Sequence, residues 1–144
     1  VKHKGSPDYK LAAKLVEELP VPVILSGGLS DTEATLAARE QTGAAAVMLA
    51  RGALGNPWLF ERVLGLRADP PTRDEIIGEL GWIIDRASEH LGEERAARYL
   101  RSFYPWYLEQ LELDKPTLIA FQQSESIDQV RSMLAELEPL TSAA

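Results

Sequence analysis

The chain has 144 residues, of which 45% are hydrophobic and 26% charged, a composition typical of a soluble globular protein with one ordinary domain or two small ones. No apolar run approaches the roughly 20 residues of a membrane span, so we expect neither a membrane helix nor a signal peptide. The absence of cysteine excludes disulfides and thiolate metal sites, and it is compatible with a reducing cytosol.

The net charge of −7 is unevenly distributed. Residues 1–66 carry seven Lys and Arg against seven Asp and Glu, whereas residues 67–144 carry eight against fifteen. A broadly acidic domain is a poor nonspecific binder of nucleic acid, because contacts to phosphate dominate such affinity. Any nucleic-acid role therefore requires a local basic patch.

Helical and strand patterns alternate in residues 1–66. Residues 1–9 are predicted to be a loop, and because the chain starts inside it without a methionine, we expect a piece of a longer protein. A helix with leucines on one face follows and stops before Pro20. Residues 21–25 are too short and too β-branched for a helix, and they and residues 44–50 are predicted to be buried strands of the parallel type.

A glycine-bearing turn and a helix follow each predicted strand. The first of these helices begins with a capping box at residues 30–33 and ends at Gly43. The second begins with Asn56 at the N-cap and Pro57 in the first turn, and it runs to about Leu64. This alternation with short connections indicates parallel α/β architecture. Two strands cannot form a stable parallel sheet, so we expect this part of the chain to be an incomplete fold.

Residues 67–144 are predicted to contain helices only. After a linker, a capping box of Thr72 and Glu75 begins a helix that Gly92 ends. The second predicted helix contains Pro105, which should kink it or divide it in two. Four helices of this length can bury a small core of their own as a bundle. They are predicted at residues 72–91, 93–111, 116–123 and 126–137.

Both glycine turns are suited to binding a phosphate. Glycine directly after a strand lets the backbone approach a ligand and aim N–H groups at it, and the following helix adds a positive dipole end. The first turn, with Gly27 and Gly28 after Ser26, fits this description. The second contains Arg51 and Gly52, and the guanidinium adds a bidentate phosphate donor. The alternative is that the glycines form simple turns and that the arginine pairs with a carboxylate.

The order of these turns favours one kind of phosphate site. In a (β/α)8 barrel, the phosphate site is commonly built from the loops after strands seven and eight, at the C-terminal face. Two consecutive strand–glycine–helix units at the end of an α/β region match that placement. A Rossmann site is disfavoured, because GGLSD lacks the G-x-G-x-x-G spacing and no acidic residue ends a later strand.

Four segments resemble the tRNA-dihydrouridine synthase family. The most specific is VMLARGALGNPWLF, which is similar to the family's V-M-I-G-R-G-A-x-G-N-P-W-x-F motif. PVILSGGLSD resembles its P-V-I-x-N-G-D-I-x-S segment, and HKGSPDY from His3 to Tyr9 resembles its Y-x-G-x-A-D-W stretch. Arg101 and the sequence WYL at residues 106–108 resemble the R-K-H-x-x-W-Y-L helix of the bacterial members. The resemblance spans nearly the whole chain.

The resemblance implies that residues 1–66 are the last βα units of a TIM (β/α)8 barrel and that residues 67–144 are the helical tRNA-binding domain. It also implies that two groups of residues bind the cofactor FMN. One group occupies the family's Asn-Gly-Asp positions on the flavin, and the other occupies its Gly-Arg pair at the phosphate, with the next glycine included. They are Ser26, Gly27 and Gly28, and Ala50, Arg51 and Gly52.

Some of these residues depart from the family pattern. Ser26 replaces an amide with a shorter hydroxyl, and Gly28 removes a carboxylate, which affects contacts to the ribityl chain or the ring. Ala50 in place of glycine is a small change. His3 stands at the family's Tyr, so it is predicted to be an exposed loop residue rather than the family's flavin-contacting histidine.

The family's reaction is the reduction of the C5–C6 double bond of uridine in tRNA by reduced FMN, which NADPH recharges while a cysteine donates the proton. That cysteine, and the lysine and glutamine that contact the flavin, belong to earlier strands. We therefore expect no catalytic residue in this chain, and this chain alone should not perform the reaction. The implied location is the cytoplasm, and no metal is expected.

Arg95, Arg98 and Arg101 recur at every third position of the second helical segment and form a stripe along one side. Aromatic residues are interleaved with them, and arginine with stacking aromatics commonly holds RNA. With the resemblance, Arg98 and Arg101 are the predicted tRNA contacts. The alternative is that the arginines pair with neighbouring glutamates and that residues 106–108 belong to the core.

Two other functions stay open. One is another phosphate-binding flavin barrel, of the dihydroorotate or nitronate type, against which the appended residues 67–144 count. The other is a non-catalytic helical interaction module with a vestigial α/β piece. The sequence predicts no oligomeric state, although the edges of an incomplete barrel favour dimerisation or strand exchange.

Overall fold

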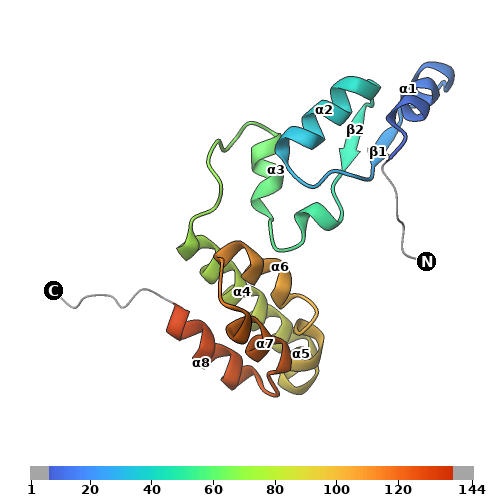
Figure 1. Cartoon of the computed structure of the whole chain (residues 1–144). Helices are drawn as coiled ribbons and strands as arrows, with labels where there is room; N and C mark the ends of the chain where they lie inside the picture. Colours follow the sequence, from blue (N-terminus) through green and yellow to red (C-terminus); the bar gives the residue numbers. More distant parts are fainter. Residues whose placement is uncertain (1–6, 138–144) are drawn as a thin grey trace. The chain divides into compact units, whose positions relative to one another are not determined.

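The computed structural model describes residues 7–137, and the chain divides into two compact units, Val1–Asp69 and Pro70–Ala144. The predicted role of His3 therefore lies outside the described residues. Unit 1 contains both strands, whereas the described part of unit 2 is helical (Figure 1). The elements of unit 1 are α1 (Tyr9–Glu18), β1 (Ile24–Ser26), α2 (Thr32–Thr42), β2 (Ala46–Met48), the 3-10 helix η1 (Arg51–Ala53) and α3 (Trp58–Val63). Those of unit 2 are α4 (Arg73–Leu91), α5 (Glu93–Leu100), α6 (Tyr104–Leu108), the 3-10 helix η2 (Glu109–Leu111), α7 (Lys115–Gln123) and α8 (Ile127–Leu137).

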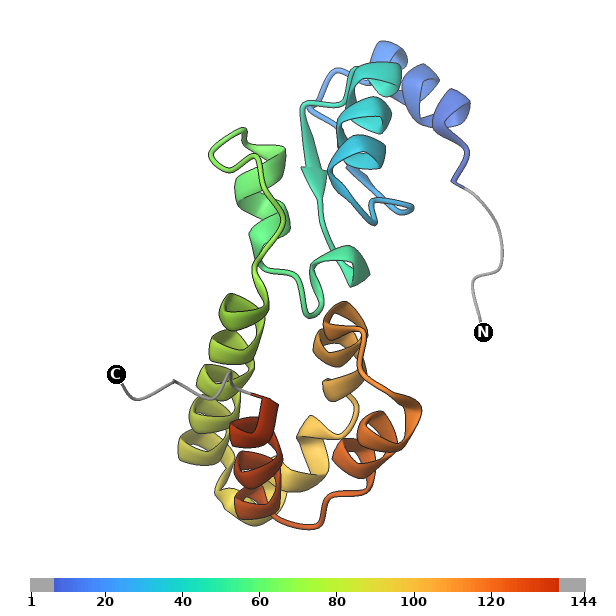
Figure 2. The same cartoon turned by 60° about the vertical axis from the view of Figure 1, so that its left-hand side comes forward.

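The two strands of unit 1 pair in parallel, with Leu25 opposite Val47, and α2 is the crossover between them. Helices α1 and α2 lie side by side (Figure 2). A small apolar core forms where they meet the sheet, and Val16 of α1 packs against it. Its buried members are Leu25, Leu29, Ala38 and Ala44.

The prediction that both strands are buried is wrong for one face of the sheet. Leu25 is only 7% exposed, but its neighbour Ile24 is 64% exposed and Met48 of β2 is 56% exposed. Strands that are apolar on both faces are typical of parallel sheets with both faces covered. The sequence pattern therefore predicts that both faces of the sheet are packed against other parts of the protein, but the described residues cover only one face.

Helix α2 begins one residue later than its predicted capping box requires. Asp31, not Ser30, is the N-cap, and its Oδ1 accepts a hydrogen bond of 2.8 Å from the N–H of Ala34. The Ser30 hydroxyl instead donates to Asp31 Oδ2 at 3.0 Å. The bonds from Ala34 and then Ser30 hold the pKa of Asp31 below its ordinary value. The end of the helix is as predicted, because Gly43 adopts the left-handed φ of 66°.

The predicted cap of the third helix in unit 1 is wrong in detail. α3 begins after Pro57, and no side chain caps it. The carbonyl of Asn56 accepts from the N–H of Leu59 at 3.2 Å, while the Asn56 side-chain oxygen is buried without a hydrogen-bond partner in the described chain. The asparagine side chain therefore points inward instead of capping the helix.

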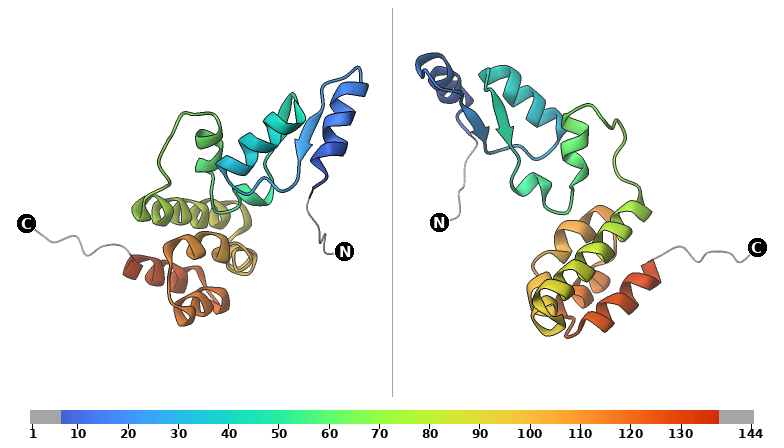
Figure 3. Two further views of the ribbon diagram at one scale, coloured as in Figure 1. Left: turned by 45° about the horizontal axis from the view of Figure 1, so that its top comes forward. Right: turned by 180° about the vertical axis from the view of Figure 1, so that it is seen from behind.

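Unit 2 has a core of its own. α4 starts at the predicted capping box, with the Glu75 N–H donating to the Thr72 hydroxyl at 3.3 Å and Glu75 accepting from the Thr72 N–H at 2.7 Å. α4 lies against α5 and α8 (Figure 3), and Arg131 of α8 donates to Asp85 of α4 at 2.8 Å. The most completely buried side chains of unit 2 include Leu80, Ile84, Leu100, Leu108, Ile127 and Val130.

The predicted helix over residues 93–111 is divided, which is one of the two outcomes expected of Pro105. α5 ends at Leu100, a turn follows, and α6 begins at Tyr104 with the proline in its first turn, where its missing N–H costs nothing. Residues 73–137 thus form five α-helices, α4 to α8, and not four.

Two features are absent from residues 7–137, a membrane-spanning helix and a cluster of metal ligands. No helix there is long and apolar enough to cross a bilayer. No group of three or more His, Asp or Glu side chains in the same residues is arranged to hold a metal ion.

Glu112 is the one non-glycine residue with a positive φ, 51°, within residues 7–137. A left-handed conformation costs an ordinary residue about 1–2 kcal/mol, part of which glycine avoids. We expect Glu112→Gly to raise the free energy of unfolding by up to about 1 kcal/mol in urea titrations followed by circular dichroism. Glu109→Gly, at a helical φ of −59°, is the matched control and should lower it by about 1 kcal/mol. A lower free energy of unfolding in both variants would contradict this account.

The cap of α2 should be pH-dependent. Because the folded-state pKa of Asp31 is lowered, its contribution to stability is complete above the unfolded pKa of about 3.9 and is lost as pH falls through the folded value. Asp31→Asn keeps an acceptor but does not titrate. The stability of the wild type relative to this variant should therefore decrease in urea titrations from pH 6 to pH 3. A difference that stays constant with pH would show that the carboxylate charge is irrelevant.

Candidate functional site

Gly52 brings the two glycine turns into direct contact. A Cβ atom on this residue would lie 2.2 Å from the carbonyl oxygen of Leu29 and 3.0 Å from Cα of Ser30. Since backbone atoms cannot yield to such an overlap, only glycine lets the chain after β2 pass against the chain after β1. The predicted cofactor-binding residues, 26–28 and 50–52, therefore lie in two connections that touch where Gly52 meets Leu29 and Ser30.

The first turn is built from two glycines in the left-handed region, with φ of 109° at Gly27 and 70° at Gly28. The N–H groups of Gly28 and Leu29 have no hydrogen-bond partner within residues 7–137. Free backbone N–H groups just before the N-terminus of a helix suit an anionic or oxygen-rich ligand. This turn can therefore donate from its backbone.

Ser26 has part of its hydrogen-bonding capacity occupied. Its hydroxyl donates to the carbonyl oxygen of Met48 at 3.3 Å, across the sheet. A serine hydroxyl has one proton and two acceptor lone pairs. In this arrangement Ser26 can accept a hydrogen bond from a ligand hydroxyl, but it cannot also donate one to a phosphate.

The charges of the two turns differ. Asp31 already places a carboxylate at the N-terminus of α2, so a phosphate there would meet a like charge. Arg51 is exposed, and its guanidinium has no ion-pair or hydrogen-bond partner in the described part of the chain, so the predicted pairing with a carboxylate is not seen there. Arg51 follows Ala50 and opens η1, whose first N–H groups have no partner in their own helix. The electrostatics therefore favour the second turn as the place for an anion.

Tyr9 is a residue of this site that the sequence reasoning missed. Its hydroxyl donates to the carbonyl oxygen of Gly27 at 3.1 Å, from a position 18 residues earlier in the chain. No local pattern could have identified it, because the bond depends on where α1 lies against β1.

The two predicted RNA contacts in unit 2 are both engaged within the protein. Arg98 of α5 is exposed and forms an ion pair of 2.9 Å with Glu94, one turn earlier, as the alternative interpretation predicts. Arg101 is half-buried, and its Nε donates to the carbonyl oxygen of Ser124, the C-cap of α7, at 2.8 Å. Arg101 therefore joins two helices, whereas Arg98 is held only by a surface pair of small net energy.

The aromatic residues near these arginines divide between core and surface. Tyr104 and Tyr107 are buried, and burial raises the pKa of each to about 12, so both stay neutral. The alternative interpretation, that residues 106–108 belong to the core, holds for Tyr107 and Leu108 but not for Trp106, which is 39% exposed because α6 starts a new helical phase after the turn at residues 101–103.

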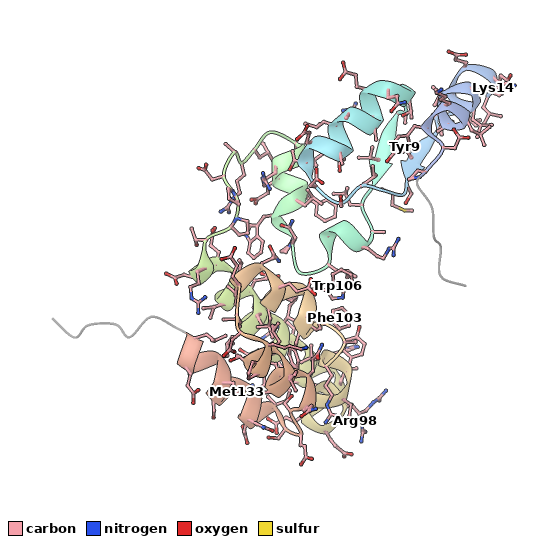
Figure 4. The ribbon with its side chains drawn as sticks, in the orientation of Figure 1. Tyr9, Lys14, Arg98, Phe103, Trp106 and Met133 are labelled. Carbon is pink, nitrogen blue, oxygen red and sulfur yellow. The ribbon has the colours of Figure 1, made fainter. Side chains whose placement is uncertain are left out.

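An aromatic pair completes this surface, with Tyr99 exposed and Phe103 half-buried. The rings of Tyr99 and Phe103 lie 4.9 Å apart, and Tyr99 is exposed. Figure 4 shows Phe103 and Trp106 on the part of unit 2 that contains α6, with Arg98 further along α5. The surface of α5 and α6 formed by Arg98, Tyr99, Phe103 and Trp106 is called the aromatic strip below.

Comparison with known proteins identifies the family. The model of the family described as dihydrouridine synthase (Dus) matches residues 2–143. A probable tRNA-dihydrouridine synthase of Mycobacterium tuberculosis (strain ATCC 25618 / H37Rv) is 28% identical over 95% of this chain and 37% of its own length. The tRNA-dihydrouridine synthase B of Pasteurella multocida (strain Pm70) is 27% identical over 94% of this chain and 41% of its own length.

A third relative, the tRNA-dihydrouridine synthase B of Vibrio parahaemolyticus (serotype O3:K6, strain RIMD 2210633), is 30% identical over 76% of this chain and 36% of its own length. The chain thus spans less than half the length of these curated relatives. Because the family model covers nearly all 144 residues, the chain belongs to the dihydrouridine synthase family.

Proposed function

We propose that this chain is the C-terminal part of a tRNA-dihydrouridine synthase, which as a whole reduces uridine to dihydrouridine in tRNA with FMN and NADPH. The observation that carries the proposal is the contact of the two glycine turns at Gly52 and Leu29 in a chain of this family; Arg51 precedes Gly52 in sequence, and its guanidinium has no partner within residues 7–137. The chain has no cysteine, so a cysteine proton donor belongs to another part of the protein.

Unit 1 supplies the last βα units of a TIM barrel in this proposal. Two parallel strands joined by a helix are the repeating unit of such a barrel, and the glycine turns follow the carboxyl ends of the strands, where its sites lie. The exposed side chains of Ile24 and Met48 give the sheet an uncovered apolar face. In the proposed protein, strands from the remainder of the chain complete the barrel.

The residues of the two turns fit a phosphorylated flavin. Arg51, with the first N–H groups of η1, binds the phosphate, and Gly52 permits the close approach. Gly28 and Leu29 offer free N–H groups, while Ser26 accepts from a ribityl hydroxyl. FMN held here and reduced by NADPH would supply a hydride to one carbon of the uridine double bond, and an acid outside this chain would supply the proton to the other carbon.

Unit 2 contacts tRNA through the aromatic strip and the two arginines. Arg101 is held in one orientation by Ser124, which leaves the terminal nitrogens of its guanidinium without a partner in residues 7–137. Arg98 must exchange Glu94 for a phosphate. Exposed aromatic rings provide faces on which unpaired bases stack.

Arg51→Ala in the full-length protein tests the flavin site. Loss of one charge-assisted contact should raise the dissociation constant for FMN about 10- to 100-fold in a titration followed by flavin fluorescence. Arg39→Ala removes another exposed arginine, in the last turn of α2, and should bind FMN as the wild type does. Equal affinity in all three proteins would remove Arg51 from the cofactor site.

Arg98 and Glu94 should affect tRNA binding in opposite directions. Arg98→Ala should weaken tRNA binding and reduce its salt dependence by about one unit of slope, because one phosphate contact is lost. Glu94→Gln should strengthen binding, because it frees Arg98 and removes a negative charge. Filter-binding titrations at several salt concentrations measure both effects.

Two further variants control for the loss of an exposed charge and for the structural role of Arg101. Arg86→Ala removes an arginine of α4 that is likewise paired with a glutamate one turn away, and it should leave tRNA affinity unchanged. Arg101→Lys keeps the charge but loses the bond to Ser124. It should therefore lower the unfolding temperature while its affinity for tRNA stays close to that of the wild type. If Arg98→Ala behaves like Arg86→Ala, α5 does not contact tRNA.

A further inference from the structure

Tyr9 and Pro7 pack against the turn that follows β1. Tyr9 is the first residue of α1, and the preceding Asp8 caps this helix by accepting from the N–H of Leu11 at 3.0 Å. The capped start of α1 therefore fixes the backbone position of Tyr9. From there the hydroxyl reaches the carbonyl oxygen of Gly27 at 3.1 Å. Figure 4 shows Tyr9 where α1 begins, with Lys14 further along the same helix.

The space beside Gly28 is filled by the same two residues. A Cβ atom on Gly28 would lie 2.7 Å from the Tyr9 hydroxyl oxygen and 2.9 Å from Cγ of Pro7. The φ of 70° at Gly28 is also one that side chains disfavour. The turn is therefore bounded by the start of α1 on one side, and its continuation at Leu29 is bounded by Gly52 on the other.

The peptide group between Gly27 and Gly28 is the part of the turn that Tyr9 controls. A peptide group is planar and trans, so its carbonyl oxygen and its N–H point in opposite directions. Between two glycines this plane can rotate with little steric resistance. The bond from Tyr9 to the Gly27 oxygen selects one orientation, and in that orientation the Gly28 N–H points away from the tyrosine hydroxyl.

We propose that Tyr9 is a positioning residue of the flavin site, whose hydroxyl orients the Gly27–Gly28 peptide so that its N–H faces the cofactor. This inference rests on the proposed FMN site. Tyr9 does not touch the flavin itself. The tyrosine hydroxyl restricts the turn to one conformation before the cofactor binds, so less conformational entropy is lost on binding. Such preorganisation raises affinity without adding a contact.

The direct test is Tyr9→Phe in the full-length protein. Its dissociation constant for FMN should rise about two- to tenfold, the range that corresponds to one net hydrogen bond. In the flavin-free protein, the backbone ¹⁵N order parameters of Gly27 and Gly28 should be lower than in the wild type, because the peptide group between them is no longer held by the tyrosine. Lys14→Ala is the control on the same helix, because Lys14 pairs only with Glu18 at 3.6 Å on the surface, and it should match the wild type in both measurements.

A double-mutant cycle tests the geometry more sharply. Gly28→Ala should weaken FMN binding, because its methyl group displaces the tyrosine hydroxyl. Once Tyr9→Phe has removed that oxygen, adding Gly28→Ala should cost less than it does in the wild type. Unaltered FMN affinity in Tyr9→Phe, even with a lower unfolding temperature, or strictly additive effects would overturn the inference and leave the FMN site in place. Failure of the wild type to bind FMN would overturn both.

Discussion

The contact of Gly52 with the Leu29 carbonyl is the constraint on which the candidate cofactor site depends. It forces the connection that leaves β2 to pass directly against the connection that leaves β1. Parallel neighbouring strands end at the same edge of a sheet, so both connections emerge on one side. A side chain at position 52 would force the two turns apart and move the backbone that follows Arg51 away from Leu29.

Charge distinguishes the two turns as candidate binding places for an anion. The Asp31 carboxylate already interacts with the positive N-terminal end of α2. Arg51, at the start of η1, carries a positive charge that has no partner within residues 7–137. The acidic unit 2 uses its arginines differently, because Arg101 and Arg131 bind partners on neighbouring helices. Few of its positive charges are left to bind a polyanion, so each of them contributes a large share of the total electrostatic binding energy.

Local chemistry explains which features the sequence could predict. The caps at Thr72 and Gly43 depend on residues within one helical turn, and both form as predicted. The exposure of the sheet could not be predicted, because apolar strands reflect the surroundings of the whole protein. The exposure of Trp106 depends on the helical phase that follows the break between α5 and α6. The hydrogen bond of Tyr9 depends on where α1 packs against β1. The pattern of glycines and arginine predicts a phosphate site, and the family resemblance assigns the phosphate to the turn of Arg51; that assignment stays a prediction.

The two units differ in how they are stabilised, and this bears on the cofactor site. Unit 2 buries side chains such as Leu80 and Leu100 in its own core, whereas unit 1 leaves Ile24 and Met48 exposed. At about 25 cal/mol per Å², covering such side chains is a stabilisation that the described residues of unit 1 do not provide. The short strands therefore hold the turns weakly by themselves. Under that condition the shape of the site depends on contacts made at the turns, the Tyr9 hydroxyl on one side and Gly52 on the other.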